Sequence, residues 1–260
     1  MALDLSAIKA KLNQLNKSDD KKNLTWKPEA GKTRVRIVPY VHRKDNPFLE
    51  LYFHYDIAKR SMLSPISFGN ADPIVEFAEK LKKTGDKEEW LMGRKIEPKM
   101  RTYVPVIVRG KENEGVKFWG FGKQIYTELL SIISDPDYGD ITDLLNGRDI
   151  DVEFTPAEGG GFPKTAIRVK PNTQPATDDK AIAEKIMNQP VITEIFPEPT
   201  YDELEKALAE WMNPENADSD VDEEEDAPLA STPAPAAKKT APVATKVDNV
   251  ADAFNDLFNS

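Results

Sequence analysis

Cationic and aromatic side chains are interleaved in the first half of this 260-residue chain. Fourteen of its 22 aromatic residues (4 Trp, 7 Tyr and 11 Phe in all) lie between residues 26 and 126, together with most of the positive charge. A hydrophobic core does not require aromatic residues and positive charge to lie in the same part of the chain. Binding of unpaired nucleic acid uses both types, because cations replace phosphate counterions and aromatic faces stack on bases. The candidate DNA-binding residues are Arg34, Arg36, Lys59, Arg60, Trp90, Arg94, Lys95, Lys99, Arg101, Tyr103, Lys117, Trp119 and Lys123.

Each of these residues also has a structural interpretation. An aromatic residue is more often buried in a core than exposed as a platform, and a surface lysine is usually only solvated. The interleaving favours a cleft in which Trp90, Tyr103 and Trp119 stack on bases while the cations contact phosphates. Stacking contributes about 1–3 kcal/mol per base whatever the base, so the expected binding is independent of sequence.

The chain offers little for catalysis or metal binding. It has no cysteine and only two histidines, His42 and His54, which excludes disulfides, thiolate nucleophiles and thiolate zinc sites. Its glycine-rich stretches lack the spacing of phosphate-binding loops. Acids such as Asp135, Asp137 and Asp140 indicate solvated loops or, less often, a cation site. We expect no metal, no cofactor and no enzyme activity, with a nuclease as the enzyme class to test.

The net charge of −10 hides a strong asymmetry along the chain. Residues 1–110 carry +8, residues 111–212 carry −10, and residues 213–260 carry −8. This distribution suggests nucleic acid as a partner of one part and a regulatory or docking role for the acidic end. No run approaches the ~18 consecutive apolar residues that cross a bilayer, so we expect a soluble chain and no membrane partner.

Both ends of the chain are expected to act outside the core. Residues 1–23 form a basic arm with a helical apolar stripe, and Lys9, Lys11 and Lys17 lie outside that stripe; a frayed terminus is the alternative. The composition of residues 213–260 predicts a disordered acidic tail. Its end has apolar residues on one helical face, which predicts a partner-docking segment unless the spacing is chance. These residues are Val250, Phe254, Leu257 and Phe258.

Six short extended segments indicate a small antiparallel β-barrel rather than a parallel α/β sheet. In the first, Val35 and Ile37 alternate with Arg34 and Arg36, so we expect the arginines on the exposed face. Pro105 predicts an edge or a bulge in the third. The expected strands span residues 33–38, 48–57, 103–109, 116–121, 149–154 and 165–169, with a hairpin turn at 112–115.

Helices are expected in an insert at about residues 59–97 and after the barrel. Asp72 followed by Pro73 predicts a helix start, and Thr200 with Glu203 predicts a capping box. The other helical patterns span residues 123–134 and 179–188. The expected core of the insert is Phe68, Ile74, Phe77, Leu81 and Leu91.

Four short stretches are similar to one known family. They are residues 36–39 (Arg-Ile-Val-Pro), 46–48 (Asn-Pro-Phe), 112–115 (Glu-Asn-Glu-Gly) and 121–123 (Phe-Gly-Lys). With the order of basic arm, core and acidic tail, they resemble the single-stranded DNA-binding, helix-destabilising proteins of T-even-like myophages. The resemblance implies cooperative coating of single-stranded DNA in phage replication, recombination and repair, in the cytoplasm of the infected bacterial host.

The resemblance also implies partners and site residues. The arm would contact neighbouring copies along the DNA, and the tail would recruit replication and recombination proteins. Trp90, Tyr103 and Trp119 fall near tyrosines of the family's DNA cleft, and Arg94 and Lys95 fall in its basic stretch.

One departure from the family concerns zinc. Well-known members hold zinc through one histidine and three cysteines. His54 lies where that histidine would be, but Met62, Asp72 and Val75 lie near the cysteine positions. We therefore expect no zinc, and an insert held by its own packing.

These observations define the expected fold class and function. The fold is α+β: an OB-fold core within residues 24–212, a helical insert, a C-terminal helical flap and a disordered acidic tail. The expected function is sequence-independent, cooperative single-stranded DNA binding. The alternative is a protein-interaction adaptor or assembly factor without nucleic-acid binding, in which the aromatics are core and both termini dock on proteins.

Overall fold

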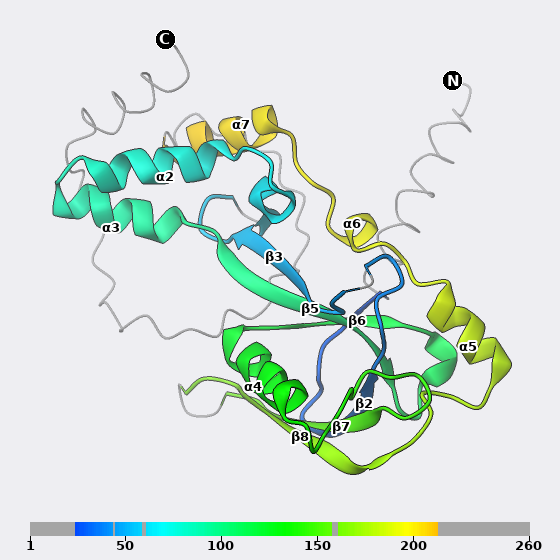
Figure 1. Cartoon of the computed structure of the whole chain (residues 1–260). Helices are drawn as coiled ribbons and strands as arrows, with labels where there is room; N and C mark the ends of the chain where they lie inside the picture. Colours follow the sequence, from blue (N-terminus) through cyan, green and yellow to red (C-terminus); the bar gives the residue numbers. More distant parts are fainter. Residues whose placement is uncertain (1–23, 44, 59–60, 158–160, 213–260) are drawn as a thin grey trace, which may run out of the picture. The chain divides into compact units, whose positions relative to one another are not determined.

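The structure, a computed structural model, describes residues 24–43, 45–58, 61–157 and 161–212 (Figure 1). It is a mixed α+β fold with an eight-stranded sheet and six α-helices within these residues, compatible with an OB-like fold. The described residues form two compact units. We call residues 24–50 and 101–196 the barrel unit, and residues 51–100 and 197–212 the helical unit. None of the described helices has the length and apolar character that crossing a membrane requires.

The sheet joins strands that are distant in the sequence. Its order is β1-β6-β5-β2-β7-β8, with β3 paired to β5 and β4 to β3. Strands β1 and β6 are parallel, and the pairs β2–β5, β2–β7, β3–β4, β5–β6 and β7–β8 are antiparallel. The strands are β1 (Thr25–Trp26), β2 (Gly31–Ile37), β3 (Leu49–His54), β4 (Met62–Leu63), β5 (Lys99–Val108), β6 (Lys117–Phe121), β7 (Arg148–Thr155) and β8 (Lys164–Thr173).

The register assigns the side chains of the barrel unit to two faces. Val35 lies opposite both Val108 and Ile150, and all three are buried, so this face is the interior. Arg36 lies opposite Ile107 and Asp149 on the outer face. Directly opposed residues share a face, so every residue of β2, β5, β6 and β7 can be assigned from these pairs.

Pro105 lies within β5 and not at a sheet edge, contrary to the expectation from sequence. It is paired with Phe118 of β6, and its carbonyl accepts a hydrogen bond from the backbone N–H of Val38 at 3.0 Å. The N–H and C=O of one strand residue point to the same side. Pro105 therefore lacks the N–H that would return a bond to Val38, and the ladder between β2 and β5 ends at this point.

Helices and one loop cover part of the barrel. They are α4 (Lys123–Ser134), α5 (Lys180–Met187) and α6 (Ile192–Ile195). Ile186 of α5 and Ala176 of the preceding loop pack with Val38, Ile107 and Val116. Because Ile107 belongs to the outer face, the segment from about residue 174 onward covers that face over β5 and the end of β2. The predicted hairpin is confirmed, with a 3-10 turn at Glu112–Glu114 and Gly115 at a φ of +81°.

The helical unit is built from two chain segments. Its elements are η1 (Pro65–Phe68), α2 (Pro73–Lys83), α3 (Lys87–Ile96) and α7 (Tyr201–Met212). Leu204 and Leu208 of α7 pack with Ile74, Phe77 and Leu81 of α2. The two helices lie side by side in Figure 1. Gly93 allows the close approach of α3, because a Cβ there would lie 2.7 Å from the carbonyl oxygen of Ala78.

Two helix starts predicted from the sequence are confirmed in this unit, and part of the predicted core is wrong. Asp72 caps α2 by accepting from the N–H groups of Ile74 and Val75. Thr200 and Glu203 make both bonds of the capping box. Phe68 and Leu91 are exposed, and the core is completed by Ile57, Ile96, Leu204 and Leu208. Contacts from α7 supply the apolar area that the insert alone was expected to provide.

Candidate nucleic-acid interface

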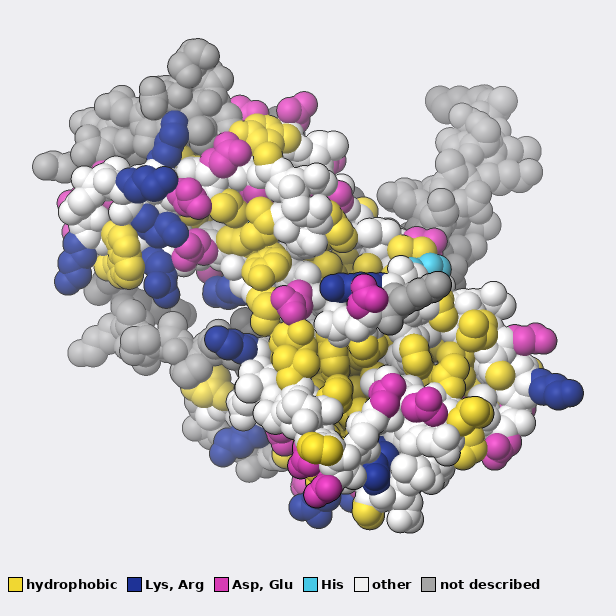
Figure 2. All heavy atoms as spheres, viewed as in Figure 1, with side chains coloured by type: hydrophobic (Ala, Val, Ile, Leu, Met, Phe, Trp, Pro, Cys, Tyr) yellow, Lys and Arg dark blue, Asp and Glu magenta, His cyan; other side chains and the backbone are white. Residues whose placement is uncertain are grey.

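Trp90 on α3 is an exposed ring beside cations, as the sequence predicts for a stacking platform. Its residue is 42% exposed, and the guanidinium of Arg94, one helical turn later, lies 5.3 Å from the ring centroid. Lys95 is also exposed. Lys and Arg side chains gather over α2 and α3 (Figure 2). The helical unit therefore presents both kinds of group that unpaired bases and phosphates require.

Lys99 lies at the start of β5 and is already engaged within the same unit. Its Nζ is 3.8 Å from Asp56 and 5.9 Å from the ring of Tyr55. The side chain is about half exposed, so the pair with Asp56 is of the weak surface kind. A phosphate can compete for Lys99 without the cost of uncovering a buried carboxylate.

Trp119 faces the interior of the barrel and is only 1% exposed. It lies opposite Val104, and its ring packs edge-on against Trp26 at 5.7 Å and Phe121 at 4.7 Å between centroids. A barrel interior must be filled by alternate side chains of each strand, and Trp119 occupies such a position. The expectation that it stacks on bases is not supported by this placement.

Tyr103 is buried as well, but on the opposite face from Trp119. It is paired with Gly120, one residue away from Trp119, so the strand period of two places the two rings on different sides. Its ring lies over Gly120, where a Cβ would come within 2.6 Å, and 4.8 Å from the ring of Phe196. Tyr103 and Trp119 therefore cannot line one cleft on this sheet.

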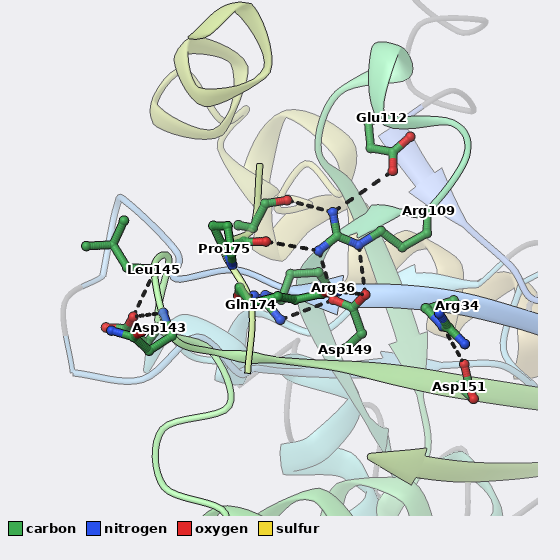
Figure 3. Close-up of polar contacts among 12 residues, drawn as sticks. Arg34, Arg36, Arg109, Glu112, Asp143, Leu145, Asp149, Asp151, Gln174 and Pro175 are labelled. Carbon is green, nitrogen blue, oxygen red and sulfur yellow. Dashed lines mark hydrogen bonds and ion pairs between the residues drawn. The ribbon is translucent and has the colours of Figure 1, made fainter. Parts of the chain in front are cut away.

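Arg36 is fully buried, although the sequence predicts it on an exposed face. It bonds Asp149 at 3.1 Å and also the carbonyl of Gln174. Arg109 donates to both oxygens of Asp149 at 2.9 Å (Figure 3). Desolvation lowers the pKa of Arg36 below its ordinary value, and the neighbouring charge of Asp149 opposes that shift. We call this group the Asp149 lock; it holds the loop at residues 174–176 against the sheet.

Arg34, two residues earlier on the same face, is 46% exposed and bonds Asp151 at 2.8 Å (Figure 3). Lys32 and Lys170 reach the other oxygen of Asp151 at 2.9 and 3.1 Å. Neither lysine was among the residues predicted from the sequence to contact DNA. The signal that could have found them is the period-two spacing of Lys32 with Arg34 and of Arg168 with Lys170 in strand-like segments.

The remaining candidates differ in their surroundings. Arg101 is half-buried at the barrel end of β5, Lys117 pairs with Glu114 at 3.4 Å, and Lys123 is exposed at the start of α4. Lys59 and Arg60 lie outside the described residues, as do the arm residues Lys9, Lys11 and Lys17 and the tail residues Val250, Phe254, Leu257 and Phe258.

His54 belongs to a buried hydrogen-bonded cluster and does not make a zinc site with its neighbours. Its Nε2 lies 3.0 Å from Asp72 and its Nδ1 lies 2.9 Å from the carbonyl of Ile96. Ser64 donates to the same carboxylate oxygen of Asp72. Both ring nitrogens are thus engaged with oxygen, and the chain has no thiolate to complete a tetrahedral set. Within the described ranges, no cluster of three potential ligand side chains is found.

The Asp72 carboxylate fixes this cluster electrostatically. Desolvation by itself would raise the pKa of Asp72, but the bonds from His54, Ser64 and the α2 backbone outweigh it and lower the pKa. The cluster joins β3, β4, the start of α2 and the end of α3. It occupies the place where the family resemblance implied a metal.

The sequence model of one family, gp32 DNA binding protein like, matches residues 29–214, well over half of the chain. The chain belongs to this family. No curated protein matches the sequence. The matched range spans nearly all of the described barrel and helical units, including α3 with Trp90 and β2 with Arg34. Membership of the gp32-like family supports single-stranded DNA binding. The candidate residues are divided between the two units, and a single cleft that joins them stays a prediction.

Proposed function

We propose that the protein coats single-stranded DNA without base preference, as a binding protein and not an enzyme. The observation that carries the proposal is the match to the gp32-like family over residues 29–214. Binding unpaired but not paired strands shifts duplex melting by mass action. We further propose that this occurs in phage replication, recombination and repair, in the cytoplasm of an infected bacterial host.

The exposed ring of Trp90 supports this proposal at the level of side chains. Of the three aromatic candidates, Trp90 alone is exposed in the described structure, and it has Arg94 on its own face of the helix. Trp90 is 42% exposed, so part of its indole ring is open to solvent and to a ligand. It has the geometry of a stacking platform with a cation for the adjoining phosphate.

A titration with oligo-dT tests the proposal. We expect quenching of tryptophan fluorescence that is reversed by salt, because counterion release drives the binding. Trp90→Ala should weaken binding by the worth of one stacked base, about 1–3 kcal/mol, which is roughly 5- to 150-fold. Leu91→Ala is the matched control, since Leu91 is an exposed apolar neighbour on the same helix. A labelled strand read by anisotropy keeps the measurement independent of the lost fluorophore.

The same titration separates the alternatives. Absence of quenching and of anisotropy change for the wild-type chain would reject DNA binding and favour the adaptor or assembly factor. Equal losses for Trp90→Ala and Leu91→Ala would retain DNA binding but remove Trp90 from the interface. Cleavage of the labelled strand in Mg²⁺ would indicate a nuclease.

Cooperativity and recruitment belong to the two ends of the chain. We propose that the arm, through Lys9, Lys11 and Lys17, contacts the neighbouring copy, and that the acidic tail, through its apolar end, binds replication and recombination proteins. A binding isotherm that is steeper on long poly-dT than on a short oligonucleotide would support the first. Loss of that difference on changing the three lysines to glutamine assigns it to the arm; isotherms of equal steepness in the wild-type chain would refute cooperativity.

For the tail, we expect capture of phage replication proteins to fail after Phe254→Ala with Phe258→Ala, and unchanged capture would refute docking there.

A further inference from the structure

The outer face of β2, β7 and β8 carries two rows of cations that flank one row of acids. Asp151 of β7 lies opposite Arg34 of β2 and Arg168 of β8, so these three side chains share the face. Adjacent strands are about 4.8 Å apart, which places the two cationic rows roughly 10 Å from each other. By the same alternation the cations are Lys32, Arg34, Lys164, Arg168 and Lys170, and the acids beside them are Asp151 and Glu153.

Asp151 lies beneath its cations. Its side chain is 3% exposed, whereas those of Lys32, Arg34 and Lys170 are 54%, 46% and 34% exposed. Burial alone would raise the pKa of Asp151, but hydrogen bonds from Arg34, Lys32 and Lys170 outweigh it and lower the pKa well below the ordinary range. The carboxylate therefore stays ionised and orients three cations, and the side chains exposed to solvent are the positively charged ones.

These cations have hydrogen-bonding capacity beyond Asp151. Arg34 bonds Asp151 through Nε, and its terminal nitrogens make no further bond within the described residues. A lysine has three donors and arginine five, so a single carboxylate satisfies only part of what the three cations offer. Cross-strand ion pairing would need one acid for each cation; apart from Arg36 and Asp149, which belong to the Asp149 lock, this face has five cations against two acids.

We propose that this face, which we call the Asp151 cation face, is a second contact surface for the phosphodiester backbone of single-stranded DNA. The inference rests on the proposed function and extends it to strands for which the sequence had indicated only Arg34. The described part of the face carries no aromatic ring in its alternation, so it contacts phosphates and not bases. Its contribution is affinity and salt dependence, with Asp151 as the positioning residue.

The test compares two double variants of the full chain. Lys32→Gln with Lys170→Gln removes two cations of the face, and Lys111→Gln with Lys180→Gln removes two exposed cations elsewhere in the barrel unit. The affinity for labelled oligo-dT is measured over a salt series. We expect the first pair to reduce the slope of log K against log salt by about 1.4, or ~0.7 for each lost phosphate contact, and the control to leave the slope unchanged.

Arg168→Gln is a further variant whose fold is not at risk, because Arg168 has no bond to Asp151; its expected slope change is about half as large. If wild-type protein fails to bind DNA, the proposed function itself fails. If wild-type protein binds, but both double variants and Arg168→Gln keep the wild-type slope, the Asp151 cation face is refuted while the proposed function stands.

Discussion

Asp149 and Asp151 lie two residues apart on one face of β7, yet their surroundings give them different roles. Asp149 is bonded to two arginines under the loop at residues 174–176, and its partner Arg36 is fully buried. Asp151 is bonded to three cations that remain in contact with solvent. The cross-strand pattern is the same in both cases, because each acid of β7 lies opposite an arginine of β2. What differs is whether another chain segment covers the cations.

This difference separates a structural network from an interface. A buried guanidinium that loses its carboxylate keeps the full penalty of desolvation, whereas an exposed cation simply rehydrates. The ion pairs of the Asp149 lock therefore stabilise the fold and do not bind a ligand. The Asp151 cation face can exchange its partners at little cost.

The largest expected effect is on the Asp149 lock. Asp149→Asn retains the shape of the side chain but leaves the buried Arg36 without its counterion and Arg109 with only Glu112 at 4.0 Å, so we expect a loss of about 3–5 kcal/mol in the free energy of unfolding. Urea denaturation measures it, with hydrogen exchange of β7 to assign the loss to the barrel unit. Asp151→Asn is the internal control. Equal losses for the two variants would break the comparison between covered and uncovered cations.

The buried cluster around Asp72 in the helical unit allows a second comparison between a buried and an exposed carboxylate. Asp72→Asn keeps an effective cap of α2 but disturbs the bonds to His54 and Ser64, so we expect a loss of about 1–3 kcal/mol. Asp86→Asn is the matched control, because Asp86 caps α3 in the same way and is exposed. Hydrogen exchange in α2 and α3 reads both. A cost at Asp86 as large as that at Asp72 would mean that capping, not burial, decides the effect.

The smallest effect is expected at Asp151. Asp151→Asn should cost about 0–1 kcal/mol at neutral pH, because its cations are exposed. The lowered pKa of Asp151 means that its contribution is present above the ordinary Asp value of about 4 and is lost as the pH falls through the lowered folded value. The stability difference between wild type and variant should therefore vanish in acid. A difference that grows as the pH falls below 4 would contradict the assignment.

Local signals in the sequence predicted much of the fold. The caps at Asp72 and Thr200, the hairpin at residues 112–115 and the helix over residues 123–134 all depend on neighbours within a few positions, and all are confirmed. The helix α3 was missed, because its sequence is highly charged and contains Gly93, whose role depends on the approach of α2.

The site residues show the limit of that reasoning. Period-two alternation determines which residues share a face, so it correctly separates Val35 from Arg36. It does not determine which faces another segment covers. Arg36 is buried beneath Gln174, a residue 138 positions away, and Trp119 is buried because its ring packs against Trp26 and Phe121.

The sequence by itself determined the capped helix starts, the alternation within the predicted strands and the family to which the chain belongs, because each of these depends on residue types in their order along the chain. Only the tertiary structure decided which cations and rings meet solvent. That choice depends on long-range contacts, in which the loop at residues 174–176 covers Arg36 beside Asp149, whereas the cations around Asp151 stay exposed. The physical reason is that burial, not residue type, sets whether an ion pair is part of the fold or is open to a phosphate.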